Sequence, residues 1–177
     1  MKGQVTRFKW FWVWQDNAEE RWLEEMSRKG YHLSSVNIPC IYTFTISEPV
    51  NYSYRLDYRR FSKSEKQDYL QIFKDAGWEY LGEISLWQYF RKQQKAGEIS
   101  EIFTDNSSKI AKYRRILAYL GLLWFVLVFI VFQRITVLPP SLPWWGNVHI
   151  FIAIVAVVMT YAIIRIGLRI RQLRMSG

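Results

Sequence analysis

Two segments of the chain repeat one pattern of apolar and polar positions. The segments WLEEMSRKGYHL (residues 22–33) and YLQIFKDAGWEY (residues 69–80) lie 47 residues apart and match at their apolar positions and at a glycine. In each segment, the apolar residues at i, i+1 and i+4 share one face of a helix. The glycine that follows can adopt the left-handed conformation that ends a helix. The pattern therefore predicts two related helices, which end at Gly30 and Gly77.

Each predicted helix also has a capping pattern at its start. Asp16 precedes Glu19 by three residues, and Ser62 precedes Glu65 by the same spacing. An oxygen acceptor followed by a carboxylate at this spacing is typical of a capping box. We therefore expect the two helices to begin near residues 16 and 62.

Segments rich in aromatic and β-branched residues flank both helices and predict strands. TRFKWFWVW precedes the first helix, and YHLSSVN and IYTFTI follow it; YSYRLDYRR precedes the second, and WEYLGEI and LWQYFRK follow it. Each copy thus reads β-α-β-β. We expect an α+β fold, in which a duplicated β-α-β-β (ferredoxin-like) domain has one antiparallel sheet with two helices on one face.

The aromatic run FKWFWVW (residues 8–14) lies in the first predicted strand. Because alternate residues of a strand share a face, we expect Phe8, Trp10 and Trp12 to point together into the core. Stacking on nucleic-acid bases is the alternative use of such rings. However, the strand signature of RNA-binding sheets is absent, and residues 1–108 balance fifteen basic with fifteen acidic side chains. This neutral balance predicts no nucleic-acid partner.

The C-terminal third contains two uncharged segments, Ile116–Phe132 and Val148–Ile164, of 17 residues each. Each would span about 25 Å as a helix, and flanking residues extend both to the roughly 30 Å of a bilayer core. Neither segment has the polar face of a soluble helix. Prolines and a glycine between them predict a turn. The sequence therefore predicts a two-helix transmembrane hairpin.

The formal net charge of +9 belongs to the same third of the chain. Four basic residues precede the first apolar segment, four follow the second, and only Arg134 lies between them. Basic residues favour the cytoplasmic side, so we expect a multi-pass protein of the cell membrane with both termini in the cytoplasm. The eight side chains expected at inner-leaflet lipid are Lys109, Lys112, Arg114, Arg115, Arg165, Arg169, Arg171 and Arg174.

These patterns predict the following organisation along the chain. Residues 1–97 form the duplicated cytoplasmic domain, 98–115 a basic juxtamembrane connector, 116–137 transmembrane helix 1, 138–146 a short extracytoplasmic loop, 147–166 transmembrane helix 2, and 167–177 a basic cytoplasmic tail.

Motifs for catalysis are absent from the sequence. The two histidines, His32 and His149, should lie on opposite sides of the membrane, and no HExxH, CxxC, GxSxG or Walker loop occurs. The single cysteine, Cys40, has no histidine beside it in the predicted strands. We therefore predict no catalytic residue, no metal site and no cofactor.

One polar patch is a candidate interaction site. Arg55, Asp57 and Arg59 alternate along a strand and should share a face, either as a solvated charge ladder or as the polar rim of a contact. Two helices can cover only one face of a sheet, so Phe11 and Phe90 are the apolar candidates for the uncovered face. The expected occupant is a protein partner or a second copy of the chain.

The run WLEEMSRKGYHL…YTFTISEPVNYSYRLDY, followed by YLQIFKDAGWEY, WQYFRK and EIFTDNSSKIAKYRR, resembles a bacterial family catalogued as domain of unknown function 2812. The resemblance covers roughly residues 5–116. It implies membrane spans after the domain and genes for PadR-type transcription regulators nearby. It implies no catalytic residue, since the family has none assigned.

Two functions fit these patterns. The first is a membrane-tethered cytoplasmic sensing or protein-interaction module, with a regulatory role among its uses. The alternative is a membrane-bound enzyme whose active site is dispersed along the sequence. A deep pocket of concentrated polar groups would favour the enzyme, and a flat face would favour the module.

Overall fold

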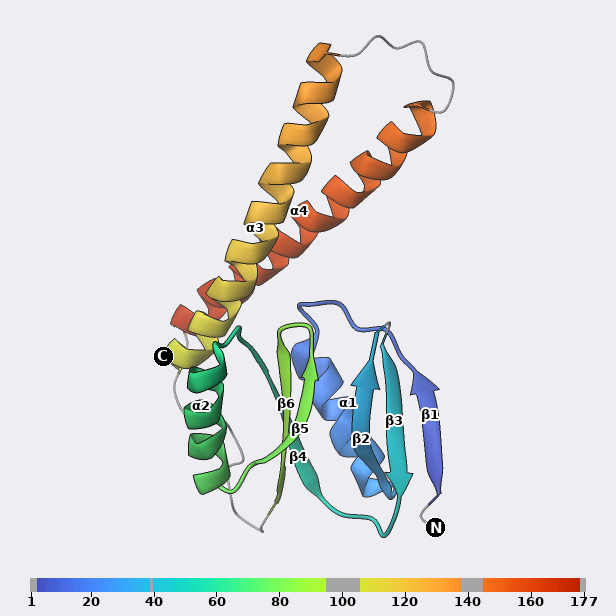
Figure 1. The fold of residues 1–177 in the computed structure, drawn as a ribbon, viewed down its shortest axis with the longest axis vertical. Coiled ribbons are helices and arrows are strands. Elements are labelled where there is room, and N and C mark those ends of the chain that lie inside the picture. Colours follow the sequence, from blue (N-terminus) through green and yellow to red (C-terminus); the bar gives the residue numbers. More distant parts are fainter. Residues whose placement is uncertain (1–2, 39, 95–105, 138–144, 176–177) are drawn as a thin grey trace. The chain divides into compact units, whose positions relative to one another are not determined.

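The computed structural model describes residues 3–38, 40–94, 106–137 and 145–175. The chain forms two compact units, Met1–Thr104 and Asp105–Gly177. The elements of the first unit are β1 (Gln4–Phe8), α1 (Asp16–Arg28), β2 (Tyr31–Asn37), β3 (Ile41–Ile46), β4 (Tyr52–Tyr58), α2 (Lys63–Asp75), β5 (Glu79–Ile84) and β6 (Trp87–Gln93) (Figure 1). The predicted α+β class and the predicted order of elements are confirmed.

The strands form two antiparallel sheets of three strands, and the predicted single sheet is wrong. The first sheet has the order β1-β3-β2 and the second has the order β4-β6-β5. Strands β2 and β5 contact each other without pairing. Each has a register shift at this contact, between Leu33 and Ser35 in β2 and between Tyr80 and Gly82 in β5. A bulge disrupts the hydrogen-bond ladder and increases the local twist of the strand. This agrees with β2 and β5 lying in contact without hydrogen-bonded pairing.

Helix α1 packs in a core that both sheets share. Its residues Leu23 and Met26 are buried, as the apolar pattern predicts. The other buried members of this core are Leu33, Tyr42 and Phe44 of the first sheet and Tyr54, Leu56 and Tyr89 of the second. Trp22 is half-buried at the edge of the core, with its ring 4.9 Å from that of Tyr42.

Helix α2 covers the other face of the second sheet. Tyr69 of α2 is buried with Trp78 and with Phe90 of β6. Phe90 follows Tyr89 directly, and neighbouring residues of a strand point to opposite faces. The second sheet is therefore covered on both faces, by α1 and the first sheet on one side and by α2 on the other. The expectation that both helices share one face is wrong.

The aromatic run before α1 is mostly exposed, which contradicts its expected place in the core. Strand β1 ends at Phe8, which pairs with Ile41, the first residue of β3. Phe8, Trp10 and Trp12 are 66%, 53% and 42% exposed. Since β1 has no partner strand beyond Ile41, the chain leaves the sheet and turns into α1. Phe11 turns inward, toward the rings of Trp22 and Tyr42.

The predicted cap of α2 is confirmed and that of α1 is wrong. The side chain of Ser62 accepts a hydrogen bond from the backbone N–H of Glu65, and the Glu65 carboxylate accepts one from the Ser62 backbone. Helix α1 instead begins after Gln15, whose side chain makes no capping hydrogen bond to the helix. Asp16 is the first helical residue and is buried.

The second unit consists of α3 (Asn106–Val137) and α4 (Trp145–Met175), which pack along each other. The windows Lys109–Gln133 and Ile150–Met175 are long and apolar enough to cross a membrane, by length and composition. Most of the predicted extracytoplasmic loop lies outside the described residues. Helix α3 begins inside the predicted connector, so its basic residues belong to the same helix as the first apolar segment.

The glycines after the two helices provide a matched test of backbone conformation. Gly30 has φ +82° and Gly77 has φ +80°. A Cβ on Gly30 would lie 2.5 Å from the backbone oxygen of Ser47, whereas on Gly77 it would meet only the Lys92 side chain at 3.4 Å. Gly77→Ala should cost about 1–2 kcal/mol through left-handed strain. Gly30→Ala should lower the free energy of unfolding by about 1–3 kcal/mol more than Gly77→Ala does, because the backbone at Ser47 must move.

Denaturant unfolding of the full chain in detergent micelles, followed by near-UV circular dichroism, measures both free energies. Equal losses for the two variants would show that the Ser47 backbone does not lie against Gly30.

Candidate functional site

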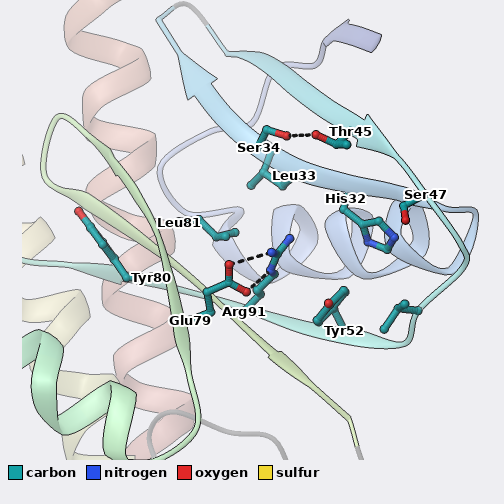
Figure 2. A pocket seen from close by; sticks show the side chains of 11 residues that line it. His32, Leu33, Ser34, Thr45, Ser47, Tyr52, Glu79, Tyr80, Leu81 and Arg91 are labelled. Carbon is teal, nitrogen blue, oxygen red and sulfur yellow. Dashed lines mark hydrogen bonds and ion pairs between the residues drawn. The ribbon is translucent and has the colours of Figure 1, made fainter. Parts of the chain in front are cut away.

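A cavity of about 480 Å³ lies where the edge strands β2 and β5 meet. Ligand pockets in proteins typically have volumes of about 300–1,000 Å³. Its polar lining comes from five strands and one connecting segment, and Figure 2 shows these side chains around one space. The polar groups most useful for recognition are His32, Ser34, Thr45, Tyr52, Glu79 and Arg91.

The paired bulges shape this cavity. Ser34 and Leu81 are the extra residues at the two register shifts, and both line the cavity. The Ser34 hydroxyl lies 2.6 Å from that of Thr45. The backbone N–H of Leu33 donates to the hydroxyl of Tyr54 in β4, at 3.4 Å, which links the two sheets beside the bulge. Bulges often occur beside functional sites because they redirect side chains.

Arg91 provides the positive charge of the cavity. Its Nε and Nη2 donate to the two carboxylate oxygens of Glu79, at 2.6 and 2.8 Å. The Arg91 side chain is 18% exposed, whereas that of Glu79 is 57% exposed. The guanidinium also lies 4.9 Å from the centre of the Tyr52 ring. Burial lowers the pKa of Arg91, but Glu79 and the nearby tyrosines raise that pKa by more, so the guanidinium stays charged.

His32 contributes a polar atom with no partner. The residue is 8% exposed, and its Nε2 lies 2.8 Å from the backbone oxygen of Glu48. A carbonyl oxygen only accepts hydrogen bonds, so this contact assigns a proton to Nε2. The Nδ1 atom is buried and has no hydrogen-bond partner among the described residues. Leaving such an atom unpaired costs about 1–3 kcal/mol, which makes it a candidate contact for a ligand.

The predicted interaction patch does not form one exposed face. Phe90 is fully buried, Asp57 is 1% exposed, and the Asp57 carboxylate accepts a hydrogen bond from Tyr69. Phe11 is half-buried against the core. Only Arg59 is exposed, with its guanidinium beside the rings of Phe61 and Tyr69.

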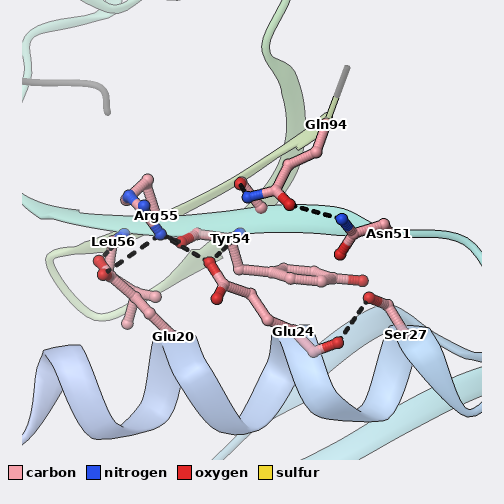
Figure 3. A network of polar contacts seen from close by, with 9 residues as sticks. Glu20, Glu24, Ser27, Asn51, Tyr54, Arg55, Leu56 and Gln94 are labelled. Carbon is pink, nitrogen blue, oxygen red and sulfur yellow. Dashed lines mark hydrogen bonds and ion pairs between the residues drawn. The ribbon is translucent and has the colours of Figure 1, made fainter. Parts of the chain in front are cut away.

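Arg55, the remaining member of that patch, belongs to a network between α1 and the edge of β4 (Figure 3). Its Nη1 donates to Glu24 at 2.7 Å and lies 3.8 Å from Glu20. The same two carboxylates accept hydrogen bonds from the backbone of β4. The N–H of Tyr54 donates to Glu24 at 3.3 Å, and the N–H of Leu56 donates to Glu20 at 2.8 Å. Side chains of α1 therefore satisfy the outward N–H groups of the edge strand β4, to which a further strand could otherwise pair.

Glu19 of α1 links the two sheets through a buried carboxylate. Its Oε1 accepts hydrogen bonds from the hydroxyls of Tyr42 in β3 and Tyr89 in β6, at 2.8 and 2.7 Å. Burial raises the pKa of Glu19, although the two hydroxyl donors lower it in part. Burial likewise raises the pKa values of both tyrosines, so the two hydroxyls keep their protons.

The residues predicted to contact lipid lie at the termini of the hairpin. Lys109, Lys112, Arg114 and Arg115 lie in the first turns of α3, and Arg165, Arg169, Arg171 and Arg174 lie toward the end of α4. Because the two helices are antiparallel neighbours, these eight residues belong to the same end of the second unit (Figure 1). Their contact with lipid remains a prediction.

The sequence alone did not identify the cavity. Glu79 and Arg91 are opposite each other in the hairpin of β5 and β6, but no spacing relates this pair to Tyr52 or to His32. The sequence offers His32 only as a metal ligand or a catalytic partner, because nothing in the spacing indicates a binding cavity. The break in alternation at Ser34 and Ser35 was the one available signal of a bulge.

Comparisons with known proteins give one match. A family model described as "Protein of unknown function (DUF2812)" matches residues 15–127. No curated protein and no solved structure matches the chain.

Glu19 makes the stability of the first unit depend on pH. Because its pKa is raised in the folded state, ionisation of Glu19 disfavours folding. This group therefore contributes stability below the ordinary pKa of a glutamate, and the contribution is lost as pH rises through the raised value. Glu19→Gln keeps an acceptor for the tyrosine hydroxyls and cannot ionise. The variant should gain stability relative to the parent as pH rises from about 4 to about 8.

Unfolding free energies of the two proteins across this pH range measure the difference. Glu25→Gln, at an exposed position of the same helix, controls for the loss of one carboxylate. A difference between parent and Glu19→Gln that does not change with pH would contradict a burial-raised pKa.

Proposed function

The chain belongs to the DUF2812 family of proteins of unknown function, and we propose that it is a membrane-anchored sensing module that binds a small molecule in the cavity between β2 and β5. The observation that carries the proposal is that His32 lines this cavity while its buried Nδ1 has no hydrogen-bond partner among the described residues. A ligand that pairs with this atom removes an energetic penalty of the free protein.

The lining favours one class of ligand. The imidazole with its proton on Nε2 offers a lone pair at Nδ1, so the ligand donates a hydrogen bond there. Arg91 favours a carboxylate, which would share or replace the bond to the exposed Glu79. Leu33, Val50 and Leu81 add apolar walls. A small hydroxy acid or amino acid has both the donor and the carboxylate.

The membrane anchor is part of the same proposal. Two helices of sufficient length and apolarity support it, as do eight cations at one end of the hairpin. In this arrangement both spans cross the cell membrane, the termini are cytoplasmic, and the cations, apart from the buried Lys112, contact the inner leaflet. A protein partner or a second copy of the chain would receive the signal of ligand binding.

Duplication of a β-α-β-β unit accounts for the position of the cavity. The bulges after Leu33 and Tyr80 are 47 residues apart, as are the left-handed glycines Gly30 and Gly77. The two sheets also share the order first-third-second strand. This agreement supports a duplicated, ferredoxin-like connectivity, with the cavity at the junction of its two copies.

Catalysis in the same cavity is the second candidate, because polar groups are concentrated there. An activated hydroxyl requires a base within hydrogen-bond distance. The Ser34 hydroxyl instead pairs with Thr45, and His32 pairs through Nε2 with a backbone carbonyl. These contacts favour binding over reaction.

Thermal unfolding of the full chain in nanodiscs, with a panel of amino acids and small hydroxy acids, tests the proposed function. We expect at least one compound to raise the melting temperature of the parent. His32→Phe should lose at least about tenfold in affinity for it, since one hydrogen bond to a buried group contributes about 1.5 kcal/mol. Ser35→Ala, an exposed position beyond the bulge in β2, is the control and should bind as the parent does.

No stabilising compound in the panel would contradict the ligand class. Equal binding by the parent and His32→Phe would place the ligand elsewhere. Recovery of the compound unchanged after incubation supports sensing, and its conversion supports the enzyme.

A further inference from the structure

Four large apolar side chains are exposed at one end of the first sheet. Phe8, Trp10 and Trp12 lie in and just after β1, and Ile38, in the turn between β2 and β3, is 74% exposed. The backbone N–H of Lys9 donates to the carbonyl of Cys40 at 3.2 Å, which holds the two segments together. Large apolar side chains left exposed close together in this way often mark an interaction site.

The tryptophan rings are held in a fixed arrangement. Trp10 contacts Trp12 edge-on at 5.7 Å, and Trp12 stacks on Trp14 at 5.1 Å. The Trp12 backbone N–H donates to the Gln15 side chain, and the Gln15 N–H donates to the Trp12 carbonyl. Phe11 anchors the segment to the core, as described above. The rings therefore project from a fixed turn that leads into α1.

The charges around these rings favour an anionic surface. Arg7 and Lys9 are exposed, and residues 1–15 contain no Asp or Glu. The guanidinium of Arg7 lies over the Tyr31 ring, and the ammonium of Lys9 lies over the rings of Phe11 and Trp22, so both cations must add to the local positive potential from these positions. Indole rings combine a large apolar body with one N–H donor, and for this reason they concentrate at the boundary between lipid and water. Basic residues beside such rings add attraction to acidic headgroups.

We propose that the segment Phe8–Trp14, with Ile38, inserts into the interface of an acidic phospholipid membrane. A lipid surface suits this patch better than a protein partner because its charged residues are all basic, its rings are indoles, and the chain itself carries two helices apolar enough to place it at a bilayer. The inference is independent of the cavity, and it gives the first unit a membrane contact of its own.

Site-specific depth measurement in the full chain tests the proposal. Trp12→Cys in a Cys40→Ser background takes a nitroxide label, and the protein is reconstituted in phosphatidylcholine vesicles with about a third phosphatidylglycerol, an acidic surface like that of an inner leaflet. The label should lie about 5–10 Å inside the headgroup boundary, protected from an aqueous nickel relaxant and accessible to oxygen. Ile72→Cys, an exposed apolar position on α2, is the matched control and should remain accessible to nickel.

Two results would overturn the proposal. Equal nickel access at positions 12 and 72 would show that the tryptophans do not enter lipid, and equal depth in vesicles of phosphatidylcholine alone would remove the role of Arg7 and Lys9. The native tryptophans provide a second readout in case the label perturbs the turn. Quenching of tryptophan fluorescence by brominated lipid should fall in Trp10→Ser/Trp12→Ser, and unchanged quenching would contradict insertion.

Discussion

The N-terminal unit depends on helix α1 occupying a place where a β-strand would otherwise be. The outer N–H groups of β4 face away from β6, and an edge strand left open in this way invites pairing with other chains. Glu20 and Glu24 accept hydrogen bonds from these N–H groups, and both carboxylates also lie beside Arg55. Glu19 extends the connection to both sheets through two tyrosine hydroxyls. Two carboxylates of α1 thus close the edge of β4, and a third joins two sheets that share no hydrogen-bonded strands.

This connection has a direct consequence for the cavity. Because α1 holds the two sheets together, β2 and β5 can lie side by side without forming a ladder. Each keeps a bulge, and the space between the bulges is lined by groups from both halves of the unit. His32 lines this space, and its buried Nδ1 has no hydrogen-bond partner among the described residues. The proposal of a ligand rests on this atom.

Local pattern and tertiary contact account for what the sequence could and could not predict. The periodicity of Leu23 and Met26 identified the buried face of α1, and Ser62 with Glu65 identified the start of α2, because both signals depend on near neighbours. The tryptophans were misplaced because β1 ends where its partner β3 begins, at Ile41. Arg55 was interpreted as facing solvent because its partners lie on a helix more than thirty residues earlier. Glu79 and Arg91 pair across the hairpin of β5 and β6, but no sequence spacing brings this hairpin to His32, so the cavity was missed.

Amide hydrogen exchange at Tyr54 and Leu56 tests most directly whether α1 closes the edge of β4. In the full chain in nanodiscs, these two amides should exchange as slowly as those of the central strand β6, because Glu24 and Glu20 accept them. Glu20→Ala should accelerate exchange at Leu56 far more than at Tyr54. Rapid exchange of both amides in the parent would mean that the edge is open to water, and it would contradict the role given to α1.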